Sequence, residues 1–261
     1  MASTFIGNSS ESFSELYEHL KSFPTPLLPP GKAHDPEMTD RIASLYVHPT
    51  LESLLHILNL DLPSAHFLVR HMQSPPCWEG MYIHGLLHRI EGDYDNCRAW
   101  YADVCTCDSF TSFFTTSDTD LPPPLSFLAP NLDALAGSPN EDEDPEASNS
   151  SSAPAKDAES GPRLMRTSQG GKVPSQASAR AFISAIEALR KTSAKAADDA
   201  SRKAELEKAS RAEIEALMKF CADQFGTGKV EDASKVWVKM GEEHRAMGES
   251  MVSGGEGYRK F

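Results

Sequence analysis

The sequence has no long apolar run and little cysteine, and each shortage excludes a class of protein. No stretch of the 261 residues approaches the roughly 18 consecutive apolar residues typical of a membrane-spanning helix. The amino terminus lacks the basic start and apolar stretch of a signal peptide. The five cysteines are an odd number and contain no Cys-x-x-Cys pair, which favours free thiols in a reducing compartment. We therefore expect a soluble cytoplasmic protein.

Familiar catalytic motifs are missing as well. The sequence contains no Gly-x-Ser-x-Gly elbow, no Gly-x-x-x-x-Gly-Lys phosphate loop and no dinucleotide fingerprint. No alternation of apolar and polar residues predicts a β-strand. These absences leave open whether the protein is an enzyme.

Basic residues are too few for a nucleic-acid surface. Lysine and arginine number 25 against 38 aspartates and glutamates, a formal net charge of −13. Because phosphate neutralisation needs clustered basic side chains, we expect neither nucleic acid nor an anionic membrane as a partner. Residues 108–160 alone carry a net charge of −10, so the rest of the chain is nearly balanced. Global charge therefore does not exclude an anionic small molecule.

The acidic segment also has little apolar periodicity. It contains a run of three prolines, the acidic run Glu141–Asp144 and a run rich in serine. From about 137 to 176 the apolar surface is too small to offset the entropy of ordering, which predicts disorder. Leu121–Pro130 is more apolar and is expected to dock on the folded part. We predict helical parts over 1–115 and 177–261, separated by a disordered acidic insert over 116–176.

The remaining sequence predicts an all-α fold. Asp61 is a candidate helix cap, and His48 or Thr50 is a candidate cap for the helix before it. Helices are expected over Pro49–Leu58, Ser64–Met72, Trp78–Glu91 and Asp93–Val104. The segment Ala179–Ala222 predicts one long helix or two helices that meet near 194–199. Pairing of this segment with a second copy of the chain would make a homo-oligomer.

An internal duplication relates the two helical parts. A shift of 136 residues lays Gly92 on Gly228 and Tyr101 on Trp237, and it aligns the preceding helices. The pattern predicts a second helix–turn–helix unit near the carboxyl terminus, with its last helix following Val230.

The first copy resembles a tetratricopeptide hairpin. Gly85 stands where that family has a small residue for close helix contact, and Gly92-Asp93-Tyr94 is similar to its turn. Cys97 and Tyr101 occupy its small and aromatic positions on the second helix. The resemblance implies helical hairpins packed as one domain, without the tandem array that forms the family's binding groove.

Histidines are concentrated in the first 90 residues, which hold eight of the nine. His84, His88 and Glu91 share one helical stripe, a spacing that lets two imidazoles and a carboxylate bind one divalent metal ion. His66, on the preceding helix, is a candidate fourth ligand or general base. The neighbouring polar residues Arg89 and Asp93 complete the candidate catalytic set, Arg89 as the group that binds an anion. The alternatives are a purely structural hydrogen-bonded network and metal-free acid–base chemistry.

The same segment resembles one found in a widespread set of fungal and bacterial proteins of uncharacterised activity. The shared pattern is His84-Gly-x-x-His88-Arg-x-Glu-x-Asp-Tyr-x-Asn followed by Trp100-Tyr101, with an upstream histidine similar to His66. The resemblance covers a small part of the chain and implies no particular reaction.

Two functions are therefore compatible with the sequence. The duplicated hairpins favour an interaction or scaffold protein that binds a protein partner. The histidine stripe favours a metal-dependent enzyme or metal-binding protein that acts on a small molecule. The duplicate copy has Phe220 and Gln224 where the first has His84 and His88, so only the first copy carries ionisable groups there.

Overall fold

The computed structural model describes residues 11–29, 32–114, 121–136, 174–192, 197–234 and 236–237. All regular secondary structure in these ranges is helical, which confirms the predicted all-α class. No helix in these ranges combines the length and apolarity needed to cross a membrane. The helices are α1 (Phe13–Lys21), α2 (Met38–Ala43), α3 (Pro49–Leu58), α4 (Leu62–Val69), α5 (Trp78–Glu91), α6 (Tyr94–Val104), α7 (Asp108–Phe114), the 3-10 helix η1 (Pro123–Asn131), α8 (Leu132–Ala136), α9 (Pro174–Lys191) and α10 (Ala197–Phe225).

Helix α3 lies in the interior of the amino-terminal half. The side chain of His48 caps it by accepting a hydrogen bond from the backbone N–H of Thr50, and Pro49 occupies the first turn. Every residue of α3 except Glu52 is buried. Asp61 caps α4 by accepting from the backbone N–H of Ser64, as the sequence predicted. Helix α4 then packs against both α3 and α5.

Helices α5 and α6 form the predicted hairpin. Gly92 ends α5 with a left-handed backbone, φ 80°, a conformation that favours glycine. The carboxylate of Asp93 then caps α6 by accepting from the backbone N–H of Asn96. The two helices approach closely at Gly85, where a Cβ atom would lie 2.7 Å from Cδ1 of Tyr101. This contact places α6 directly beside the face of α5 that carries His84.

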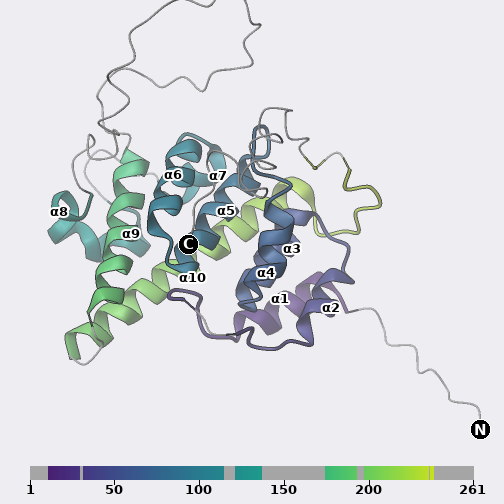
Figure 1. Ribbon diagram of the computed structural model, residues 1–261, viewed down its shortest axis with the longest axis horizontal. Coiled ribbons are helices and arrows are strands. Elements are labelled where there is room, and N and C mark those ends of the chain that lie inside the picture. Colours follow the sequence, from purple (N-terminus) through teal and green to yellow (C-terminus); the bar gives the residue numbers. More distant parts are fainter. Residues whose placement is uncertain are drawn as a thin grey trace, which may run out of the picture.

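The segment predicted as one long helix or two consists of α9 and α10. Figure 1 shows α10 running past α9, α5 and α3 along the length of the body. Helix α10 packs against α3, α7, α9 and η1. It therefore joins the amino-terminal helices to the segments that follow α7.

Part of the predicted acidic insert is folded. In η1 and α8, the side chains of Leu125, Leu128 and Ala136 are buried, which confirms that the apolar stretch docks on the body. The predicted disorder extends to Gln176, but α9 begins at Pro174. Residues 137–173 lie outside the described part of the chain.

The second predicted hairpin is absent from the described residues after α10. Residues 229–234 and 236–237 form turns and coil where the duplication predicted a helix. Tertiary contacts explain the difference, because the backbone N–H of Val230 donates to the carbonyl of Tyr46 at 2.7 Å and the thiol of Cys77 donates to the carbonyl of Val236. This segment is thus held against the amino-terminal half and does not pair with α10. The remainder of the predicted helix lies outside the described residues.

Candidate metal centre

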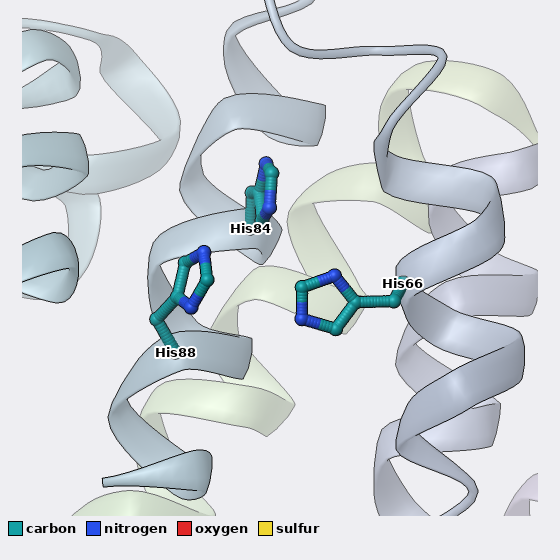
Figure 2. Close-up of side chains that lie close together, drawn as sticks. All are labelled: His66, His84 and His88. Atoms are coloured by element: carbon teal, nitrogen blue, oxygen red, sulfur yellow. The ribbon is translucent and has the colours of Figure 1, made fainter. Parts of the chain in front are cut away.

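Three histidines from two helices meet between α4 and α5. His66 projects from α4, and His84 and His88 lie one turn apart on α5. One ring nitrogen from each lies within 4.8 Å of those of the other two. Figure 2 shows the three rings turned toward the same space. The predicted partnership between His66 and the α5 histidines is therefore present in the fold.

Aromatic contacts hold the rings in place. The rings of His84 and His88 are stacked, with centroids 4.8 Å apart, and His66 presents its edge to both. Trp100 of α6 stacks on the other side of this pair, 4.6 Å from the ring of His84. Packing thus limits the rotation of His84, the most buried histidine of the three, whose exposed fraction is 6%.

Ring nitrogens in this cluster are buried without hydrogen-bond partners. The Nδ1 atoms of His66 and His84 have this property, whereas Nδ1 of His88 lies 3.4 Å from a carboxylate oxygen of Glu91. A buried polar atom without a partner costs about 1–3 kcal/mol. Nδ1 of His56, outside the cluster, also lacks a hydrogen-bond partner, so it is the convergence of the three rings that points to a ligand. His48, by contrast, places its Nδ1 2.8 Å from the hydroxyl of Thr50.

Glu91 contacts two of the three rings. Its Oε2 lies 3.0 Å from Nε2 of His66 and 3.4 Å from Nδ1 of His88. Burial by itself raises the pKa of this carboxyl, but the hydrogen bonds and charges of His66 and His88 outweigh it and lower the pKa to about 2. Glu91 is consequently a carboxylate at neutral pH. The other ring nitrogen of His66 and the other ring nitrogen of His88 lie on the side of each ring away from the Glu91 carboxylate.

The electrostatic environment keeps His84 neutral. Burial, followed by the charges of His88, His66 and Arg70, lowers the pKa of His84 to about 3. Neutral imidazole is the form that binds metal ions. His84 therefore has a free electron pair for a ligand bond throughout the physiological pH range.

Asp93 lies at the edge of the cluster. Its Oδ2 is 3.9 Å from Nδ1 of His88, but the same atom accepts a 2.7 Å hydrogen bond from the side-chain amide of Asn96. Its Oδ1 accepts from the backbone N–H of Asn96 and caps α6. In the structure, the Asp93 side chain therefore acts as the N-cap of α6.

Arg89 points away from the histidines. Its guanidinium is fully buried and donates to Oε2 of Glu213 at 2.7 Å and to the hydroxyl of Ser210 at 3.1 Å. The ring of Phe182 lies 4.9 Å from the same guanidinium. Because successive residues of an α-helix are rotated by about 100°, the neighbour of His88 faces α10. The expectation that Arg89 binds an anion beside the histidines does not agree with this placement.

Two residues near the cluster were not predicted as site residues. Trp100 belongs to the motif that follows the histidines in sequence, and its position on the second helix of the hairpin is the signal that places it beside His84. Arg70 follows His66 by four residues on the same helical face, is exposed, and contributes its charge to the environment of His84. That spacing was a usable signal for a cation near the site.

Comparison of the chain with protein-family models, with curated proteins and with solved structures finds no match.

Proposed function

We propose that this protein binds one divalent transition-metal ion through His66, His84 and His88, and that it uses the ion to act on a small molecule. The observation that carries the proposal is the convergence of one ring nitrogen from each of three histidines between α4 and α5, with the Nδ1 atoms of His66 and His84 buried and unpartnered. Three imidazoles are the ligand set of one common type of catalytic zinc site, in which water or substrate takes the fourth position.

The spacing of the rings is compatible with closure around an ion. Metal–nitrogen bonds of about 2.0–2.1 Å in a tetrahedral site place ligand atoms about 3.3 Å apart. The ligand atoms here lie within 4.8 Å of one another, so binding an ion requires them to approach by at most about 1.5 Å. Because His84 is packed between Trp100 and His88, we expect His66 to make the largest adjustment.

In this proposal Glu91 orients two ligands and is not itself a ligand. Metal-bound histidines commonly donate their second ring N–H to a carboxylate, which fixes the tautomer and the ring orientation. Oε2 of Glu91 is placed for this role toward Nε2 of His66 and Nδ1 of His88. This assignment differs from the sequence expectation, in which Glu91 is a ligand and His66 is a fourth ligand or a base.

Access to the site comes from the side of Glu91, whose side chain is 33% exposed. A small molecule can reach the open coordination position from there, and a metal ion can activate water or polarise an oxygen bound to it. Arg70 supplies a positive charge close to the cluster and makes no ion pair with any described residue. We propose that the small molecule carries an anionic group for this reason.

The scaffold interpretation depends on a second, matching hairpin. The described residues after α10 form turns and coil where the last helix of that hairpin is predicted to begin, and the rest of that helix lies outside the described residues. The histidine cluster is therefore the better supported basis for a function.

The test is metal analysis of the purified chain. Protein treated with a chelator and dialysed is titrated with Zn²⁺ and, separately, with Co²⁺, whose visible absorption reports the coordination. We expect one ion per chain, with stoichiometric binding lost in His66→Gln and His84→Gln. The matched control is His71→Gln, which alters an exposed histidine bonded to the carbonyl of Phe67. Circular dichroism verifies that each variant is folded.

Two outcomes would overturn the proposal. One is the absence of stoichiometric binding by the folded parent protein. The other is equal binding by the parent and by folded His66→Gln and His84→Gln.

A further inference from the structure

A second candidate site lies at the opposite end of α5. An open pocket of about 790 Å³ is formed where the first turn of α5, the segment between α6 and α7, and the last turns of α10 meet. Among the residues that line it are Trp78, Glu79, Cys107, Asp108, Phe220 and Asp223. A volume of this size is within the range of small-molecule sites, roughly 300–1,000 Å³.

The pocket contains a carboxylate that lacks a cation. Glu79 is only 9% exposed, yet its side chain makes no ion pair and accepts no hydrogen bond from another described residue. Burial, followed by the nearby charge of Asp108, raises the pKa of Glu79. A buried acid in this state is costly unless a ligand compensates it. Glu79 therefore offers the pocket a largely buried carboxylate that no cation of the described residues pairs with.

The remaining charges in the pocket have the same sign. Asp108 and Asp223 are exposed acids on its wall, and no lysine or arginine is among its lining residues. Asp223 has a partner of its own in Lys219, whereas Asp108 has no ion pair within the described residues. The pocket consequently attracts positive charge from solution.

The aromatic residues indicate which kind of cation fits. Trp78 and Phe220 both line the pocket. Aromatic faces combined with carboxylates bind alkylammonium groups through cation–π attraction and ion pairing. A metal ion is a poorer fit, because the group of metal-ligating side chains found among the described residues is the histidine cluster and includes none of these acids. The pocket is also far larger than one ion needs.

We propose that this pocket binds a linear aliphatic polyamine, with one ammonium group on Glu79 beside Trp78 and a second toward Asp108 and Asp223. More than one ammonium group is inferred because the three carboxylates come from three different segments around one open space. The proposal does not depend on the metal site, which involves other side chains of α5.

Calorimetric titration of the full chain with spermidine tests this proposal. We expect a single saturable site and a change in tryptophan fluorescence that Trp78→Leu removes. Glu79→Gln should weaken binding about tenfold or more, since a hydrogen-bonded ion pair is lost. The substitution replaces an uncompensated buried acid with a neutral group of the same shape, so we expect the fold to persist. The matched control is Asp103→Asn, which removes one acidic charge from α6 outside the pocket lining.

Three results would contradict the proposal. Spermidine binding weakened equally by Glu79→Gln and Asp103→Asn would indicate general charge attraction. Complete competition by Mg²⁺ at equal ionic strength would indicate a site for inorganic cations. A folded parent protein without saturable spermidine binding would exclude the site. The His84→Gln variant should bind spermidine as the parent does, which separates this site from the metal centre.

Discussion

Nε2 of His66 and Oε2 of Glu91 lie 3.0 Å apart, and this hydrogen bond joins α4 to the last turn of α5. The same carboxylate oxygen is 3.4 Å from Nδ1 of His88. A single side chain thereby contacts one histidine from each helix of the cluster. Its position is suited to orienting rings for a ligand that neither helix could hold alone.

Replacing Glu91 should weaken metal binding without abolishing it. In Glu91→Gln the amide retains the size of the side chain but loses the negative charge that fixes the two rings. Loss of such an orienting group typically reduces metal affinity about 10–100-fold. Competition for Zn²⁺ with a chromophoric chelator measures the effect, and the stoichiometry should remain one ion per chain. A Glu91→Gln affinity equal to that of the parent would show that the carboxylate does not orient the ligands.

Gly85 should be required for both stability and metal affinity. A Cβ atom there would lie 2.7 Å from Cδ1 of Tyr101 and 2.9 Å from Cβ of Trp100. We expect Gly85→Ala to force α5 and α6 apart, costing about 1–3 kcal/mol, and to move Trp100 from its stack on His84. Urea unfolding and zinc titration measure the two effects.

The matched control is Gly228→Ala, because an added Cβ there meets no atom within 4 Å. This variant should be within about 0.5 kcal/mol of the parent in free energy of unfolding. Equal stability of the two alanine variants would mean that the close contact at Gly85 is readily relieved.

The starts and ends of the helices could be predicted from the sequence because the residues that determine them are close in sequence. Asp61 and Asp93 are capping residues placed just before their helices, and Gly92 marks the end of α5. For residues 229–234 and 236–237 the duplicated pattern was wrong, because this segment is fixed by contacts with Tyr46 and Cys77, which are more than 150 residues away. Periodicity carries no information about such contacts.

The histidine cluster could also be predicted from local signals, and its long-range partners could not. His84, His88 and Glu91 share a stripe of one helix, so their proximity follows from helical geometry. Helical geometry also turns Arg89 away from His88, but the partner that it meets there, Glu213 of α10, is 124 residues away, and no local pattern reveals that partner. Trp100 and Arg70 are intermediate cases, because each lies close in sequence to a predicted residue but was not assigned to the site.

His48 should make the fold sensitive to mild acid. Its ring stacks on Phe225 with centroids 3.8 Å apart, and burial lowers its pKa from 6.5 to about 4. Since the folded-state pKa is below the unfolded one, the stability that depends on neutral His48 is present above about pH 6.5 and is lost as the pH falls toward 4.

The variant His48→Asn tests this dependence. Asparagine retains a side-chain acceptor for the cap of α3 but cannot be protonated. Its free energy of unfolding should decrease less than that of the parent between about pH 7 and pH 4, measured with urea at each pH. All other titratable groups are common to the two proteins, so the difference isolates His48. Parallel curves for the two proteins would show that protonation of this ring does not affect stability.

The buried pair of Arg89 and Glu213 should stabilise the fold and leave the metal centre unaffected. Both side chains have an exposed fraction of 0%, and Oε1 of Glu213 also accepts hydrogen bonds from the hydroxyls of Tyr82 and Tyr101. Arg89→Met leaves a buried carboxylate without its cation, a change that typically costs about 3–5 kcal/mol. We therefore expect a large decrease in the urea midpoint.

The double variant Arg89→Met/Glu213→Gln distinguishes a lost charge balance from lost packing. Glutamine removes the uncompensated charge and still accepts hydrogen bonds from the two tyrosines, so the double variant should recover much of the stability lost in Arg89→Met. Each folded variant should still bind one zinc ion, because the guanidinium contacts Ser210, Glu213 and Phe182 and none of the histidines. If the stable double variant does not bind zinc, Arg89 belongs to the metal site. If the single and double variants are equally unstable, the loss of stability comes from lost packing and not from the unpaired charge.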